Sequence, residues 1–246
     1  MRRILSLLIM VVVTVSVSAF DFRPISRDFD PQGPGALQTF RITNNRDSRI
    51  AVRISMFDRE MEADGSEVRT RVEDRFVVFP ARLTLDPGQT QVIRVQWRGG
   101  SVDTEQAYRI VAEQLPVDFE ERAAEGGTLN ILFRYVGSVY VVPPNAEPNV
   151  TVEEARVVDA GEDGATLELT MHNAGTAHTI LKDLALTVTQ TRENNATHRA
   201  TFAPEELSPV AGSNLLAGAR RSLTLQLPGE WREGPAEVSL DFNVTR

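Results

Sequence analysis

The sequence predicts an all-β protein made of two β-sandwich domains. Short segments in which apolar and polar residues alternate, at the two-residue period of a strand, recur along the chain and are separated by turn-forming residues. Three prolines near the middle, Pro143, Pro144 and Pro148, divide these segments into two sets. No segment has a convincing long helical period. Strands at this spacing favour sandwiches.

The N-terminus has the pattern of a signal peptide. Arg2 and Arg3 precede an apolar run from Ile4 to Val13, and Val17 and Ala19 occupy the minus-three and minus-one positions of a signal-peptidase site. A membrane anchor would need roughly 20 apolar residues, and this run is shorter. We therefore expect a secreted chain that is cleaved after Ala19.

Composition excludes several classes of function. The formal net charge is −8, and a protein that binds nucleic acid needs a basic surface. The chain has no cysteine, which excludes disulfides, thiol catalysis and cysteine-ligated metals, so each domain is held together by packing. Lys182 is the only lysine, so any buried group that holds an anion must be an arginine.

The first set of strands begins after the signal peptide. Leu37 to Thr43 and Ile50 to Phe57 alternate and flank the turn-rich segment Asn44 to Ser48, which predicts a hairpin. A Pro-Gly turn at Pro87 separates two later strands. The remaining predicted strands of this domain are Phe76 to Phe79, Leu83 to Leu85, Gln91 to Trp97 and Tyr108 to Leu115.

The run from Thr128 to Pro144 predicts one long strand with an apolar face. Its alternating side chains are Leu129, Ile131, Phe133 and Tyr135. Such a strand can cover the core of its own domain, or it can offer apolar side chains and an open edge to another chain. Alternation fits both uses, because either one needs apolar residues on a single face.

A second set of strands follows the prolines. We therefore predict a signal peptide at 1–19, an N-terminal domain at 20–143 and a smaller C-terminal sandwich at 144–246. The predicted strands of the second domain are Val150 to Val158, Ala165 to Met171, Thr179 to Thr189, Ala200 to Phe202, Arg221 to Leu227 and Ala236 to Val244.

The chain carries little that indicates catalysis. His172 and His178 lie in one turn region without the further ligands that a zinc site needs. Ser213 lacks the Gly-x-Ser-x-Gly pattern of serine hydrolases. We expect no enzyme, no metal and no cofactor, and the alternative from another class is a hydrolase that uses a pair of acidic residues.

Several segments match, in order, the motifs of a known family. They are Ile25 to Phe29, Phe40 to Asn45, Phe79 to Val95, Tyr108 to Pro116, Leu129 to Pro143 and, more thinly in the second domain, His172 to Leu184. On these segments the chain resembles the PapD-like periplasmic pilus chaperones. The resemblance implies two immunoglobulin-like β-sandwich domains set at an angle, with a cleft between them.

The resemblance also implies a function. A pilus subunit lacks the last strand of its sandwich, and a chaperone of this family completes it with its own strand before delivering the subunit to an outer-membrane usher. By this resemblance Leu129, Ile131, Phe133 and Tyr135 bind the subunit, in the periplasm, and the free form is expected to self-associate through the same strand. The alternative is an immunoglobulin-like adhesion or structural module that assembles permanently through exposed edges.

The family holds the terminal carboxylate of the subunit with two basic residues. Arg27 takes the first position if Ser26-Arg27 is aligned with the family's Thr-Arg. The family's lysine falls on Ser138, which cannot supply a charge. Arg134 lies on the same face four residues earlier, roughly 13 Å away, and is the candidate substitute. The family's interdomain arginine becomes Val142. These departures indicate a divergent member.

Overall fold

The computed structural model describes residues 19–116, 131–161, 164–191 and 197–245. Within these ranges the chain forms β-strands and two short 3-10 helices, η1 (Pro34–Ala36) and η2 (Pro204–Leu207). None of the described helices has the length and apolar character needed to cross a membrane. The predicted signal peptide lies outside the described residues except for Ala19.

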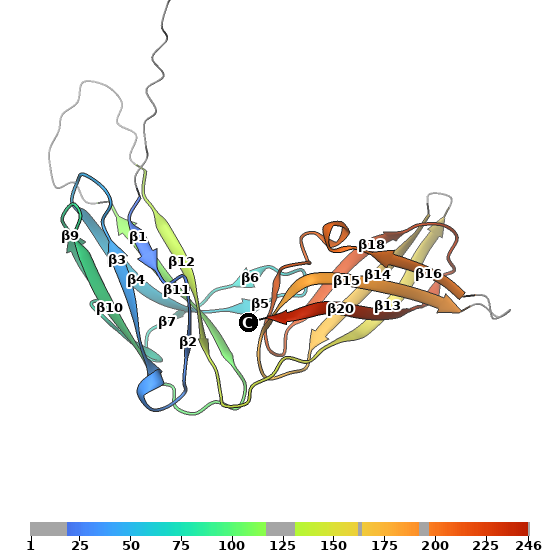
Figure 1. The fold of residues 1–246 in the computed structure, drawn as a ribbon, viewed down its shortest axis with the longest axis horizontal. Coiled ribbons are helices and arrows are strands. Elements are labelled where there is room, and N and C mark those ends of the chain that lie inside the picture. The colour runs from blue at the N-terminus through green and yellow to red at the C-terminus, as the bar shows by residue number, and fades with distance from the viewer. Residues whose placement is uncertain (1–18, 117–130, 162–163, 192–196, 246) are drawn as a thin grey trace, which may run out of the picture.

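The N-terminal domain is a sandwich of two sheets (Figure 1). The chain crosses from one sheet to the other between its first two strands, at Pro24. One sheet has the order β1 (Asp21–Arg23), β3 (Leu37–Thr43), β10 (Thr90–Trp97) and β8 (Phe76–Phe79). The other has the order β2 (Ser26–Phe29), β12 (Arg134–Val141), β11 (Gln106–Leu115), β4 (Ile50–Asp58) and β7 (Arg71–Val72), with β9 (Arg82–Leu85) also paired to β4.

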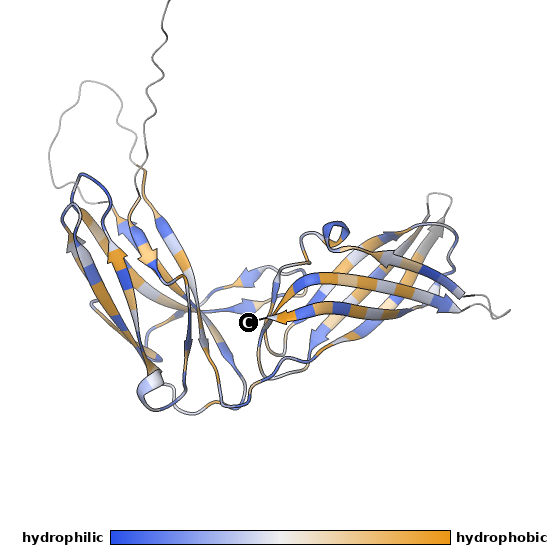
Figure 2. Ribbon diagram, in the orientation of Figure 1, coloured by the Kyte–Doolittle hydropathy of each residue, from blue (hydrophilic) through white to orange (hydrophobic). Residues whose placement is uncertain are grey.

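Aromatic side chains from both sheets fill the first core. The ring of Phe76 lies edge-on to three others, at centroid distances of 4.8 Å from Tyr108, 5.1 Å from Trp97 and 5.9 Å from Phe29. Such edge-to-face pairs add to the free energy gained by burying apolar area. Hydrophobic and hydrophilic residues alternate along the strands, as Figure 2 shows, so that one face of each sheet is buried.

The C-terminal domain is a second sandwich with its own core of aliphatic side chains. One sheet has the order β18 (Arg220–Leu227), β14 (Gly164–Asn173), β13 (Val150–Gly161) and β19 (Gly234–Pro235). In the other, β15 (Thr179–Thr191) pairs with β16 (Thr197–Phe202), β17 (Asn214–Leu215) and β20 (Glu237–Thr245). The predicted fold class, all-β with two immunoglobulin-like sandwiches, is confirmed.

A buried asparagine has the same task in both domains. Asn44 directly follows β3, and its amide donates to the carbonyl oxygens of Ser48 and Leu85 at 2.9 and 3.0 Å. Asn173 ends β14, and its amide donates to the carbonyl oxygens of Ala177 and Leu215. Each side chain therefore fixes the turn that follows its strand and joins that turn to a distant segment.

The two sandwiches meet at an angle (Figure 1). A small hairpin of β5 (Glu60–Met61) and β6 (Glu67–Val68) extends from the first domain to the second, where the amide of Ser222 donates to the carbonyl oxygen of Ala63 at 2.7 Å. A second backbone hydrogen bond, from Glu105 to Thr176, joins the domains at 2.9 Å. Contacts at two separate places restrict the angle between the two domains more than a single point of contact would.

Candidate functional site

Half of β12 has a free edge. β12 pairs with β11 along its whole length, but on its other side β2 pairs only with Ser138 to Val141. The chain before β2 passes close to Gly137, because a Cβ atom added to Gly137 would lie 2.9 Å from the carbonyl oxygen of Ile25. The stretch from Arg134 to Val136 has no strand partner on that side among the described residues. Its backbone groups are therefore available to another strand.

The structure places the four predicted binding residues in different environments. Tyr135 and Phe133 pack against the domain's own core, with the Tyr135 ring 4.7 Å from that of Phe20. Ile131 is 42% exposed. Leu129 lies outside the described residues. The strand assignment begins only at Arg134, so the described part of the long strand is shorter than the sequence predicted.

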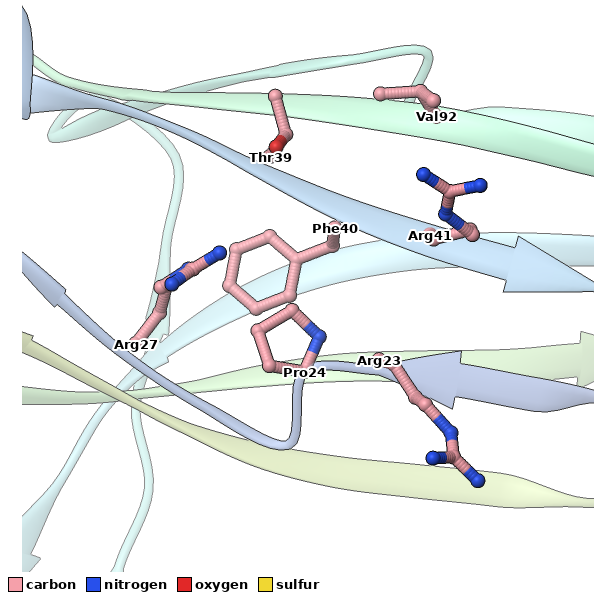
Figure 3. A pocket seen from close by; sticks show the side chains of 7 residues that line it. All are labelled: Arg23, Pro24, Arg27, Thr39, Phe40, Arg41 and Val92. Atoms are coloured by element: carbon pink, nitrogen blue, oxygen red, sulfur yellow. The ribbon is translucent and has the colours of Figure 1, made fainter.

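The register of β2 against β12 separates Arg27 from Ser138. Ser26 lies opposite Ser138, and residues that lie opposite each other in a sheet project to the same face. Arg27 lies opposite Val139, which is buried in the core. Arg27 therefore projects to the other face of the sheet, where Figure 3 shows it beside Phe40. The two positions expected to share one anchor are not brought together.

The basic group that does lie at Ser138 is Arg109. The two residues are opposite each other in the β11–β12 pair, and the Arg109 guanidinium donates to Ser138 Oγ. The same guanidinium forms an ion pair with Glu67, which also pairs with Arg59 at 2.6 Å. Arg59 in turn donates to the Tyr140 hydroxyl at 3.0 Å. We call Arg59, Glu67, Arg69 and Arg109 the Glu67 cluster.

The Glu67 cluster keeps an excess of positive charge although it is largely buried. Burial alone would raise the pKa of Glu67, but hydrogen bonds from Arg109 and Arg69 and the charge of Arg59 lower it from 4.5 to about 2. The side chains of Arg59 and Arg109 are only 5% and 15% exposed, and three guanidinium groups face one carboxylate. Arg59 Nε is buried and lacks a hydrogen-bond acceptor among the described residues. Such a group can bind a further carboxylate through paired hydrogen bonds.

Arg134 lies away from this cluster. It is exposed and stands opposite Glu113, at the start of β12, whereas Ser138 and Arg109 pair farther along the same two strands. The Ser138 face carries Tyr140 as well, and the Tyr140 ring contacts His178 of the second domain. This face is therefore the side of the sheet that looks toward the C-terminal domain.

His178 belongs to the domain interface. Glu105 Oε1 lies 2.7 Å from His178 Nδ1 and accepts a hydrogen bond from the His178 backbone amide at 3.1 Å. The His178 side chain is 4% exposed and stacked on Tyr140. The described residues contain no group of three histidine, aspartate or glutamate side chains that could hold a metal ion.

Sequence reasoning missed Arg109, Arg59 and Glu67. A signal was present for Arg109, because it is a charged residue within the apolar stretch Ala107 to Ala112, and a charge at such a position needs a partner. No comparable signal marks Glu67, because it lies in a polar segment of the sequence. Its place beside the arginines follows from the fold of the β5–β6 hairpin.

Comparison with known proteins supports the same interpretation of the fold. Residues 32–147 match the family model described as pili and flagellar-assembly chaperone, PapD N-terminal domain. No curated protein sequence matches the chain.

Solved structures share the two-domain fold at low sequence identity. The pre-assembly complex of the chaperone CsuC and the tip adhesion subunit CsuE, from archaic chaperone-usher Csu pili of Acinetobacter baumannii, contains a match with a TM-score of 0.59 and 13% identity, which covers 91% of this chain and 98% of that one. The class 5 fimbriae chaperone CfaA matches with a TM-score of 0.57 and 14% identity, over 92% and 100% of the two chains. A chaperone–tip adhesin complex of CFA/I fimbriae contains a match with a TM-score of 0.58 and 13% identity, over 91% and 98%. Residues 32–147, which form most of the N-terminal domain, therefore belong to the PapD N-terminal domain family of pili and flagellar-assembly chaperones.

Proposed function

We propose that this chain is a periplasmic chaperone that binds pilus subunits by donor-strand complementation and delivers them to an outer-membrane usher. Residues 1–19 would be removed on export, 20–143 would form the domain that binds the subunit, and 144–246 would form the second domain. The observation that carries the proposal is the free edge of β12 at Arg134 to Val136.

The free edge suits a partner that lacks a strand. A subunit with an incomplete sandwich has an open groove and an unpaired edge, and a strand from another chain can satisfy both by backbone pairing and by alternate apolar side chains. Ile131 is already exposed, and we assign it, with Leu129, to the groove. Phe133 and Tyr135 cover the core of the chaperone's own N-terminal domain in the free chain. In the complex they would lie between this core and that of the subunit.

We assign the anchor for the subunit's terminal carboxylate to the Glu67 cluster. In this assignment Arg109 supplies, from the neighbouring strand, the charge that Ser138 lacks, and Arg59 lies next to it. The carboxylate would replace part of the interaction with Glu67. Arg134 remains the alternative, at the opposite end of the strand.

Co-purification tests both assignments. The mature chain, with an affinity tag, would be co-expressed with the pilus subunits encoded nearby, and the wild type compared with Ile131→Asp and Arg109→Gln. The matched controls are Val77→Asp, because Val77 is also 42% exposed but lies on the other sheet, and Arg53→Gln, because Arg53 forms an ion pair on the same sheet as Arg109. We expect equimolar subunit with the wild type and both controls, and little or none with the two test variants.

Other results would redirect the proposal. If only Ile131→Asp abolishes binding, the strand is the site, the anchor lies elsewhere and Arg134 is tested next. If a subunit stays bound in the presence of purified usher, or no subunit binds at all, the adhesion-module function is favoured. Self-association of the free chain is tested by sedimentation at high concentration, where we expect a dimer that Ile131→Asp disrupts.

A further inference from the structure

The outer face of the β1–β3–β10–β8 sheet carries arginines and exposed apolar side chains in adjacent rows. In one row Arg23, Arg41 and Val92 are cross-strand neighbours, and in the next row Thr39, Arg94 and Phe79 are. The residues between these positions along each strand point into the core. We call the surface formed by Arg23, Thr39, Arg41, Phe79, Val92 and Arg94 the arginine face.

Two hollows on this surface share Val92. The larger has a volume of about 270 Å³, and Figure 3 shows Arg27 and Arg41 on either side of the Phe40 ring at its base. The smaller, of about 150 Å³, is lined by Phe79, Pro80, Gln91, Val92 and Arg94. A ligand that lies across Val92 reaches both hollows, so the two are best treated as one surface.

Most of the positive charge on this face is not neutralised by the described residues. Asp21 holds Arg23 at 2.7 Å, but no hydrogen bond or ion pair joins Arg27, Arg41 or Arg94 to a described carboxylate. Arg23 and Arg41 stand directly opposite each other, and like charges in that position destabilise a sheet. The whole chain carries a formal net charge of −8, so a group of arginines without acidic partners differs in sign from the chain as a whole.

Apolar side chains are exposed among these arginines. Phe79 is 69% exposed and Val92 is 41% exposed, although both belong to regular strands of a closed sandwich. An exposed apolar group next to unpaired cations is typical of an interaction surface. A nucleic acid would offer anions, but the negative charge of the chain as a whole opposes such a partner.

We infer that the arginine face docks an acidic, extended segment of a partner protein that carries an aromatic side chain beside its carboxylates. Arg41 and Arg94 are diagonal neighbours across two strands, roughly 7 Å apart at the backbone. Residues i and i+2 of an extended segment are separated by about the same distance and project to one side. Two carboxylates at that spacing therefore meet the two guanidinium groups. An aromatic residue at i+4 then continues past Arg94 onto β8, where it lies beside the exposed Phe79. This surface belongs to the sheet that lacks β12, so it goes beyond the proposed subunit site.

A synthetic peptide provides the test. The probe is an acetylated, amidated and fluorescently labelled Glu-Ser-Glu-Ser-Phe-Ser, titrated with the full mature chain at low salt and followed by fluorescence anisotropy. We expect saturable binding that weakens at least tenfold in Arg41→Glu/Arg94→Glu, and also when both Glu residues of the peptide are replaced by Gln. The matched control is Arg82→Glu/Arg156→Glu, which reverses two exposed charges on other sheets and should leave the affinity unchanged.

Separate measurements keep the interpretation clear. Circular dichroism and subunit co-purification of Arg41→Glu/Arg94→Glu should match the wild type, so failure of the subunit-binding function is distinguishable from failure of this inference. Equal binding by both double variants, equal binding of the Gln peptide, or no saturable binding would overturn the inference. A dimer of the chain alone that disappears in Arg41→Glu/Arg94→Glu would also overturn it, because the face would then belong to a second copy.

Discussion

The ring of Tyr140 lies flat on the imidazole of His178, with centroids 3.8 Å apart and planes 11° from parallel. Tyr140 belongs to β12, and His178 immediately precedes β15, so this stack joins the two sandwiches. Glu105, from the first domain, accepts a hydrogen bond from the backbone amide of His178, and its Oε1 lies 2.7 Å from His178 Nδ1. Val142 replaces the family's interdomain arginine in this chain, and a buried ring stack and a buried carboxylate join the two domains instead.

His178→Leu is expected to lower the free energy of unfolding by about 2 to 4 kcal/mol. The change removes the ring partner of Glu105 and leaves the carboxylate buried with fewer hydrogen bonds. Differential scanning calorimetry should show the C-terminal domain unfolding separately, and small-angle scattering should show a wider range of interdomain angles. His172→Leu is the control, and an identical calorimetric trace for both variants would refute the role given to His178.

Glu67→Gln is expected to remove part of the acid sensitivity of folding. The pKa of Glu67 is lowered from 4.5 to about 2, so its ionised form stabilises the fold fully above about pH 4.5, and this contribution is lost as the pH falls toward 2. Urea denaturation should show the variant about 2 to 3 kcal/mol less stable than the wild type at pH 6, with the difference reduced to less than about 1 kcal/mol at pH 2.5. Glu73→Gln, whose ion pair with Arg71 is exposed, should show no such convergence.

Gly137→Ala should destabilise the attachment of β2 to β12. An added Cβ would lie 2.9 Å from both the Ile25 carbonyl oxygen and Ile110 Cγ2, and the backbone cannot yield as a flexible side chain can. We expect a loss of about 2 to 3 kcal/mol and faster amide exchange at Arg27. Gly33→Ala is the comparison, because Gly33 has a φ of 73° but open space around it, so only about 1 kcal/mol of backbone strain is expected. An equal cost for both would show that the close approach is unimportant.

Asn44→Ala should lower the free energy of unfolding by about 2 to 4 kcal/mol. The substitution leaves the carbonyl oxygens of Ser48 and Leu85 without this donor, and the lost bond to Leu85 is buried. Urea denaturation measures the effect, and Asn149→Ala, at an exposed position, should change stability by less than about 0.5 kcal/mol. A small effect for Asn44 would mean that water replaces the amide.

The sequence was sufficient to predict most of the fold. The prediction for Leu37 to Thr43 is confirmed to the residue by β3, and the predicted strands from Ile50 and Gln91 correspond to β4 and β10. The predicted hairpin of the first two strands is wrong, because β3 and β4 belong to different sheets. These strands have one buried face, so the alternation of their residues is strong. The start of β12 is different, because Ile131 to Phe133 alternate in sequence yet lie outside the assigned strand.

The candidate site was less predictable because it depends on register. A shift of one residue in the pairing of two strands moves every side chain to the other face. Arg27 is adjacent to Ser26 in sequence, and only the pairing of β2 with β12 shows that Ser26 shares a face with Ser138. Arg109 reaches the same place from another strand, and no local pattern in the sequence specifies which strands become neighbours.

The parallel pairing of β2 with β12 also has a consequence in time. A chain is synthesised and exported from its N-terminus, and β2 must wait for a strand more than a hundred residues later before it has any partner in its sheet. We therefore expect the sandwich to close at β12 late in folding. β12 completes the sandwich of its own domain, and its first half keeps the free edge. A molecule in which β12 has not yet paired therefore presents no ordered edge to another strand.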